Sequence, residues 1–249
     1  MPAAAQAEQS AEALAKQLNN PIASLISLPF QLNYDEGFGP DGDGKRTLLN
    51  VQPVIPFDLS PEWNLISRTI VPLVYNDEIV PDDTKFGVGN VVQSLFISPK
   101  QSTSAGWIWG VGPVFQIPLA TDDQFGPDTW AAGPTGVALK QAGPWTFGAL
   151  ANHLWDVGGS DTDINASFVQ PFLSYTTPDA ISYTINTESV YDWDADQWSV
   201  PINLMVSKVI NINAQPISIG LGVRYWAETP QGAADDFGAR FLVTYLFPK

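Results

Sequence analysis

Hydrophobic and polar positions alternate with a period of two over long stretches of this chain. In GWIWGVGPVFQIPLA, residues 106–120, every second residue is apolar, from Trp107 to Leu119. The residues between them are smaller and partly polar, among them Gly112 and Gln116. A period of two places the two rows on opposite faces of a β-strand. Strands of soluble domains are usually about five or six residues long, whereas a stretch of this length suits a tilted strand that crosses a bilayer.

The same alternation recurs along the chain and predicts twelve strands. They lie near residues 23–34, 46–57, 62–76, 86–98, 106–120, 130–141, 145–156, 164–177, 181–192, 197–210, 216–228 and 237–248. One face of most of these strands is apolar, and the opposite face carries mainly Ser, Thr, Asn, Gly and Arg. An apolar outer face, a polar inner face and an even number of strands predict an all-β fold. We expect a transmembrane up-and-down antiparallel β-barrel of about 12 strands.

The connections between the strands differ by parity. Those that follow odd-numbered strands hold 20 of the 26 Asp and Glu residues. Those that follow even-numbered strands are mostly shorter and carry few acids, and Lys100, Lys140 and Lys208 lie at or beside them. In an up-and-down barrel, odd and even connections emerge at opposite rims. The parity therefore favours a barrel over a soluble sandwich and predicts an acidic extracellular rim, with both termini in the periplasm.

Composition narrows the classes further. The chain has 249 residues, of which 45% are hydrophobic and only 15% charged, below the roughly 25% of an ordinary soluble domain. A net charge of −15 argues against a nucleic-acid partner, because binding phosphates requires a cationic surface. Aromatic residues near the strand ends predict two girdles in contact with outer-membrane lipid and lipopolysaccharide. They are Trp63, Tyr75, Trp107, Trp109, Trp130, Trp145, Trp155, Tyr191, Trp193, Trp198, Trp226 and Phe247.

The first twenty residues form a segment separate from the barrel, which we assign to residues 21–249. Ala11, Leu14, Ala15 and Leu18 recur at helical spacing, and Pro21 ends the run. A helix of about fourteen residues would be roughly 21 Å long. The segment 1–20 would either plug the lumen or lie at the periplasmic mouth.

Several stretches resemble a family of bacterial outer-membrane barrels known simply as transporters, which is grouped with the MetA-type barrels of phenol degradation. They are NPIASLISLPFQLNYD, LNVQPVIPFDLSPEWNLISRTIVPLVY, GWIWGVGPVFQIPLATDD, GALANHLW, FVQPFLSYTT, NTESVYDWDADQWSVPINLMVSKV and TYLFPK. The resemblance covers the chain from Asn20 onward. It implies an outer-membrane channel that passes small hydrophobic or aromatic compounds, and it transfers no site residues. The sequence contains no motif for a cofactor or for energy coupling, so we expect passage to be passive. An apolar wall allows a homo-oligomer as readily as a monomer in lipid.

Polar residues on the inner faces are the main candidates for contact with a solute. Arginine forms paired hydrogen bonds to carboxylates, so such a set would line a narrow channel and hold an anionic or hydroxylated solute. The alternative is a closed network in which Arg and Glu satisfy one another and fill the lumen of a structural barrel. The candidates are Arg68, Asn186, Glu188, Asn203, Arg224, Arg240, Asn50, Gln52, Gln93 and Gln116.

The acidic rim is a candidate cation site. Carboxylate oxygens suit Ca²⁺, which would also bridge the rim to lipopolysaccharide. No stretch of the rim has the full EF-hand pattern, and simple solvation of exposed loops is the alternative. The candidate ligands are Asp122, Asp123, Asp192, Asp194 and Asp196.

The only histidine, His153, raises the question of an enzyme. Some outer-membrane barrels are lipid hydrolases that use Ser and His on the outer wall. Alternation places His153 on the lipid side near the outer rim, beside Trp155, which occupies the position where a His-x-Ser arrangement needs serine. A serine of the neighbouring strand, Ser167 or Ser174, is the remaining partner. A histidine beside an aromatic girdle is the ordinary interpretation, so we expect a channel that is not an enzyme.

Overall fold

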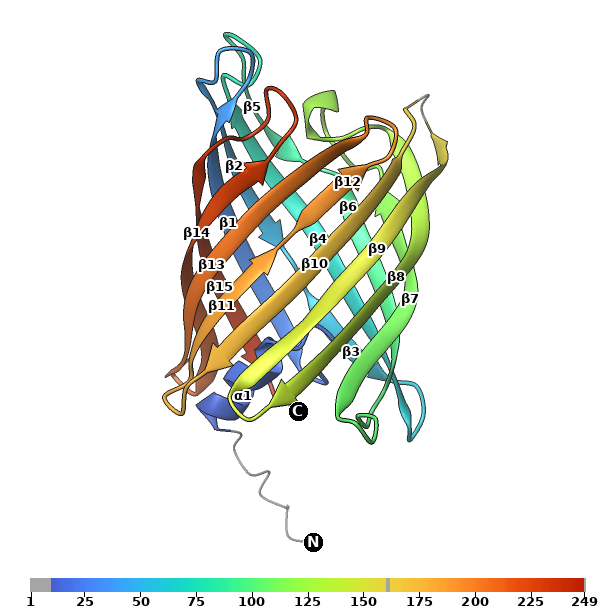
Figure 1. The fold of residues 1–249 in the computed structure, drawn as a ribbon, viewed down its shortest axis with the longest axis vertical. Helices are drawn as coiled ribbons and strands as arrows, with labels where there is room; N and C mark the ends of the chain where they lie inside the picture. The colour runs from blue at the N-terminus through green and yellow to red at the C-terminus, as the bar shows by residue number, and fades with distance from the viewer. Residues whose placement is uncertain (1–9, 160–161, 249) are drawn as a thin grey trace, which may run out of the picture.

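The computed structural model describes residues 10–159 and 162–248, which form one short helix and a closed antiparallel β-barrel of twelve strands (Figure 1). Nine strands are continuous: β1 (Ile26–Phe38), β4 (Trp63–Asp77), β7 (Trp107–Ile117), β8 (Thr129–Ala142), β9 (Trp145–Gly159), β10 (Asn165–Thr176), β13 (Gln197–Ile212), β14 (Gln215–Glu228) and β15 (Phe237–Phe247). The barrel closes where β15 pairs with β1, and each strand also pairs with its neighbour in sequence. The expected strand number and all-β class are confirmed.

Three of the twelve strands are each divided into two segments. The pairs are β2 (Gly44–Val51) with β3 (Val54–Asp58), β5 (Thr84–Val88) with β6 (Val91–Pro99), and β11 (Ile181–Thr187) with β12 (Ser189–Asp192). The first break contains Pro53, which has no N–H to donate to a ladder. The second contains Gly89 and Asn90, and the third is the single residue Glu188. The sequence predicted these strands as continuous, so this part of the prediction was wrong.

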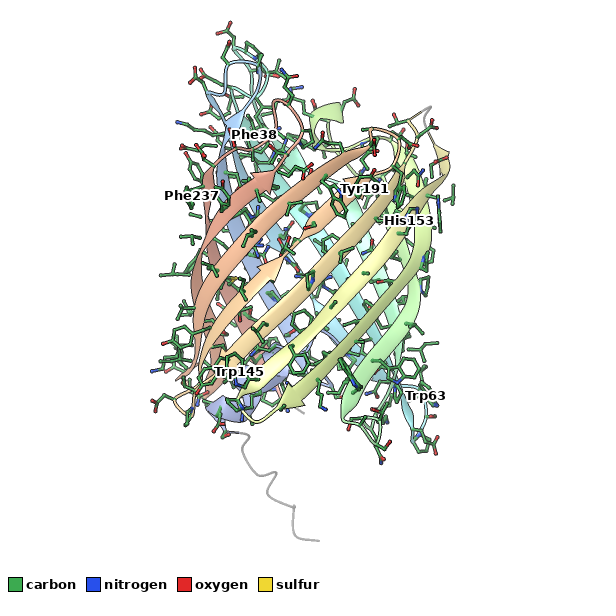
Figure 2. The ribbon with its side chains drawn as sticks, in the orientation of Figure 1. Phe38, Trp63, Trp145, His153, Tyr191 and Phe237 are labelled. Atoms are coloured by element: carbon green, nitrogen blue, oxygen red, sulfur yellow. The ribbon has the colours of Figure 1, made fainter. Side chains whose placement is uncertain are left out.

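The ends of the barrel differ as the loop parity predicted. The connections after β1, β4, β7, β9, β12 and β14 lie at one rim, called here the acidic rim, and α1 (Ala11–Leu18) lies at the other (Figure 1). Large aromatic side chains lie on the outer wall at both levels, with Trp63 and Trp145 toward the α1 end and Tyr191 and Phe237 toward the acidic rim (Figure 2). No helix of the described residues is long and apolar enough to cross a membrane.

Helix α1 packs inside its end of the barrel. It is shorter than the fourteen residues expected, and residues 1–9 lie outside the described residues. The helix begins after Ser10, whose Oγ accepts from the N–H of Ala13 at 3.2 Å. Its Leu14 and Ala15 are 2% exposed and pack against barrel side chains that include Val209 and Leu246.

The chain that follows α1 also lies in the lumen, as far as the start of β1. Ile22 packs within a fully buried apolar cluster formed by the inner faces of four strands. The other members are Ile66, Phe96, Val137, Leu139 and Leu150. The sequence predicted an inner face that is mainly polar. At the α1 end the inner face is apolar because protein, not water, covers it.

Strands β6 and β7 approach each other unusually closely at Gly112. The ladder is interrupted between the pairs Ser94–Val114 and Ile97–Val111. A Cβ atom built on Gly112 would lie 1.8 Å from the carbonyl oxygen of Leu95, so the strand path depends on the absence of a side chain here.

We expect Gly112→Ala to lower the thermal stability of the folded barrel, since the added methyl group must push β6 and β7 apart. Heat-modifiable mobility on semi-native gels measures the folded fraction against temperature. Gly136→Ala is the matched control, because its Cβ would meet nothing closer than 3.7 Å. Equal unfolding temperatures for the two variants would contradict this account of the wall.

Candidate solute site in the lumen

A carboxylate at the break between β11 and β12 joins two arginines of the last hairpin. Glu188 accepts hydrogen bonds from Arg240 through both carboxylate oxygens, at 3.0 and 2.6 Å, and one from Nη2 of Arg224 at 3.1 Å. Arg240 is 2% exposed and Arg224 is 6% exposed. Charge-assisted, bidentate contacts of this kind are the strong ones among hydrogen bonds. The three side chains therefore form one rigid unit on the inner wall.

A second carboxylate, Asp35 of β1, completes this network. Its Oδ2 accepts from Nη1 of Arg224 at 2.9 Å, and its Oδ1 accepts from the indole of Trp226 at 2.9 Å. The sequence assigned Asp35 to the acidic loops and Trp226 to an aromatic girdle. Both assignments were wrong, because β1 extends to Phe38 and the inward face of β14 continues past Arg224 to Trp226.

Neutral amides accept hydrogen bonds from the Nε atoms of these arginines. Nε of Arg224 donates to Asn203, which in turn donates to Asn186 at 2.9 Å. Nε of Arg240 donates to Asn33 at 2.7 Å. Each guanidinium group is thereby bonded on several sides within the protein, which is the arrangement of a closed network.

Arg68 of β4 is bonded differently. Its Nη2 donates to Oε1 of Gln52 at 3.1 Å, and the described residues offer no other hydrogen-bond acceptor to this side chain. Glu188 is near enough to act on it electrostatically but does not contact it. Arginine carries five N–H donors in a planar fork, so most donors of Arg68 have no partner among the described residues, and the side chain borders an open space in the lumen.

That open space is a cavity of about 580 Å³. Seven of the residues expected to line the lumen contribute to its surface: Arg68, Asn186, Glu188, Arg240, Asn50, Gln52 and Gln116. Two others, Asn203 and Arg224, are buried in the network behind it. Residues that follow α1, among them Asn19 and Asn20, close the cavity on one side.

The cavity is not polar all round. Apolar side chains from five strand segments contribute to its wall: Ile70, Val92, Leu154, Phe168 and Val190. Ile70 is two residues from Arg68 on the same face of β4. The cavity thus presents charged and amide groups beside aliphatic and aromatic surface, and a ligand with both kinds of group would match it.

Gln93 was expected in the lumen, and the structure contradicts this. It lies on the same face of β6 as Ile97, which is 45% exposed on the outer wall. Its side-chain amide accepts from Thr69 Oγ1 at 2.6 Å and donates to the carbonyl oxygens of Arg68 and Ser94. The register of β6 decides the face, and the amide is tolerated on the outer wall because its hydrogen bonds are satisfied.

The cation sites suggested at the acidic rim do not form among the described residues, in which no three acidic or histidine side chains are grouped to hold a metal ion. Nζ of Lys85 bonds Asp122 at 2.7 Å. This contact lowers the pKa of Asp122, with help from the N–H of Gln124. Asp192 instead accepts from two backbone N–H groups of its own turn. Asp123, Asp194 and Asp196 likewise belong to loop structure: η1 (Asp123–Phe125), a bond from Asn165 and a bond from Tyr191.

His153 has a serine partner on the outer wall. Its Nδ1 lies 2.8 Å from Oγ of Ser167, which faces it across the β9–β10 ladder. The indole of Trp193 also donates to Ser167 Oγ, at 2.9 Å, while Nε2 of His153 is buried without a partner among the described residues. Figure 2 places His153 toward the acidic rim. The other candidate, Ser174, is buried and bonds Thr184.

Comparison with known proteins gives structural relatives only. No protein-family model and no curated protein matches the chain. The COG4313 outer membrane channel from Pseudomonas putida F1 is similar, with a TM-score of 0.69, 13% identity and coverage of 90% of this chain and 94% of that one. Outer membrane phospholipase A from Escherichia coli has a TM-score of 0.54, 12% identity and coverage of 89% and 90%. The NanC porin has a TM-score of 0.53, 11% identity and coverage of 89% and 100%.

Such identities establish a shared fold. They do not confirm a grouping with the MetA-type barrels, and that resemblance therefore rests on the sequence stretches alone. An outer membrane channel, a porin and a phospholipase share this architecture, so the fold alone does not choose among their activities. The chain has the fold of a bacterial outer-membrane β-barrel.

Proposed function

We propose that this protein is a passive channel of the bacterial outer membrane for small molecules, including apolar or aromatic compounds. The observation that carries the proposal is the cavity of about 580 Å³ inside the barrel, lined by both polar and apolar side chains. A structural barrel whose lumen is filled by a closed network would not contain a cavity of this size. The volume lies in the range of small-molecule sites in general.

The rims suggest the orientation of the channel. The acidic rim would face outward and the α1 end the periplasm, which places both termini in the periplasm. The two levels of aromatic side chains would contact the interfaces of the membrane. Two of the structural relatives are an outer membrane channel and a porin, which supports a location in the outer membrane.

The segment 11–25 would close the periplasmic end of the route. It is held by the apolar contacts of Leu14, Ala15 and Ile22 and by few polar ones. Among these, Asn19 Nδ2 donates to Thr176 Oγ1 at 3.0 Å, and Gln141 donates to the carbonyl oxygen of Lys16 at 2.8 Å. No backbone ladder ties this segment to the wall, so it can leave the lumen without breaking the barrel.

Single-channel current across a planar lipid bilayer tests the proposed function. We expect discrete current steps from the full-length protein, or from a protein whose N-terminal segment is released. Correct folding is verified by heat-modifiable mobility. Absence of steps from both forms would contradict a channel and favour a closed barrel with a structural or lipopolysaccharide-binding role.

The contact between Asn19 and Thr176 allows the segment to be locked. The chain contains no cysteine, so the two thiols of the double variant Asn19→Cys/Thr176→Cys are the only pair that can form a disulfide, and thiol alkylation before and after reduction verifies that the bond has formed. We expect the oxidised form to carry less current than the same protein after reduction, because the bond holds segment 11–25 in the lumen. The single variant Asn19→Cys is the control. Currents that do not respond to reduction would show that this segment does not close the route.

A second candidate function rests on the contact between His153 and Ser167. Nδ1 of His153 could take the Ser167 proton as Oγ attacks a lipid ester, and return it to the leaving alcohol; water would then hydrolyse the acyl-serine. The site faces the lipid, where such a substrate lies. Against it, the described part of the chain supplies Nε2 of His153 with no third group of the kind that orients a catalytic histidine.

Release of fatty acid from phospholipid vesicles decides this candidate. If it holds, His153→Ala and Ser167→Ala abolish the release, while Ser174→Ala, on the lumenal side, leaves it unchanged. If wild-type protein releases no fatty acid, the candidate is refuted and the His153–Ser167 contact is structural.

A further inference from the structure

We propose that the lumenal cavity binds a small organic carboxylate with an apolar body, of which benzoate is the simplest aromatic probe, and that Arg68 binds its carboxylate group. The proposal rests on the proposed channel function and names the class of solute that the channel would select. It follows from the charges, the unused donors and the apolar surface of one cavity.

The charges around the cavity do not cancel. Glu188 and Asp35 are the carboxylates of the network, and Arg224 and Arg240 are bonded directly to them. These four side chains are neutral as a group. Arg68 therefore adds one positive charge that no carboxylate of residues 10–159 or 162–248 contacts. An enclosed charge of this kind favours an anion, since screening by water is weaker inside the barrel than outside it.

The unused donors have the geometry of a carboxylate site. Gln52 takes one N–H of the Arg68 fork and fixes its position. The remaining donors lie in one plane and match the two oxygens of a carboxylate. None of the side-chain nitrogens of Arg68 is both buried and unpaired, so their open side is the cavity.

The apolar part of the cavity wall favours a carboxylate that carries an apolar group. Ile70 flanks Arg68 on β4, and Val92 faces Ile70 across the β4–β6 ladder. Phe168 and Leu154 line the cavity from β10 and β9. A ring or short alkyl chain against these side chains would remove apolar surface from water. An inorganic anion or acetate would leave these apolar side chains exposed to water.

Binding to the full-length protein in detergent micelles is the direct test, measured by saturation-transfer NMR with benzoate, its neutral analogue benzamide, and acetate. We expect benzoate to bind more tightly than either of the others. Arg68→Gln should raise the Kd of benzoate roughly tenfold to hundredfold, the range for a charge-assisted hydrogen-bonded pair, and leave benzamide unchanged. Arg68→Lys should weaken benzoate less, because it keeps the charge and loses the fork.

Arg46→Gln is the matched control. Arg46 is also an arginine of the inner wall, but it bonds Asn76 at 2.9 Å, lies over the ring of Phe38 and does not line the cavity. Its substitution should leave the Kd of benzoate unchanged. Equal affinity for benzoate and benzamide, or an unchanged Kd in Arg68→Gln, would overturn the proposal.

The ion current separates this proposal from the proposed function. Benzoate that binds through Arg68 in a protein without current refutes the channel and leaves the carboxylate site. Current that persists in a protein without Arg68-dependent benzoate binding refutes the carboxylate site and leaves the channel.

Discussion

Every backbone N–H and C=O of a wall that faces lipid must find its partner within the protein, and the rest of this structure depends on that constraint. Closure of β15 onto β1 meets it for the ladder as a whole. At two of the three breaks in the divided strands, other contacts meet it locally. At the first break, the N–H of Gln52 bonds Pro29 and the N–H of Thr69 bonds Pro53. At the second break, the N–H of Gly89 bonds the carbonyl oxygen of Pro72.

The breaks in the wall also place the candidate site. Gln52 lies at the break between β2 and β3, and Glu188 is the residue that separates β11 from β12. Gln52 fixes Arg68, and Glu188 fixes both arginines of the last hairpin. A regular strand presents its side chains at fixed intervals, whereas a break lets one side chain leave that pattern. Irregular backbone at two points of the wall thus supports a precise polar arrangement in the lumen.

Sequence periodicity predicted the parts of the structure that repeat. A period of two, repeated along the chain, predicts the twelve strands and the apolar outer wall. The parity of the connections predicts that acidic loops gather at one rim. Single positions were harder, because a strand end displaced by a few residues changes their environment. Asp35 was assigned to a loop for this reason, and the register that turns Gln93 outward is set by tertiary pairing. Ser167 was named only as one of two serines, since strand alignment between β9 and β10 is not visible in one sequence.

The acidic rim and Arg68 would act on an anionic solute in opposite directions. The rim charges are exposed, and salt screens them over a Debye length of about 8 Å at physiological ionic strength. Some are further offset by local pairing, as Lys85 offsets Asp122. Arg68 lies inside the wall, where the same salt acts less. Rising ionic strength therefore weakens the repulsion of an anion by the acidic rim more than its attraction to Arg68. A carboxylate would then enter more easily from a medium of high ionic strength. The attraction of cations to the acidic rim would weaken under the same conditions.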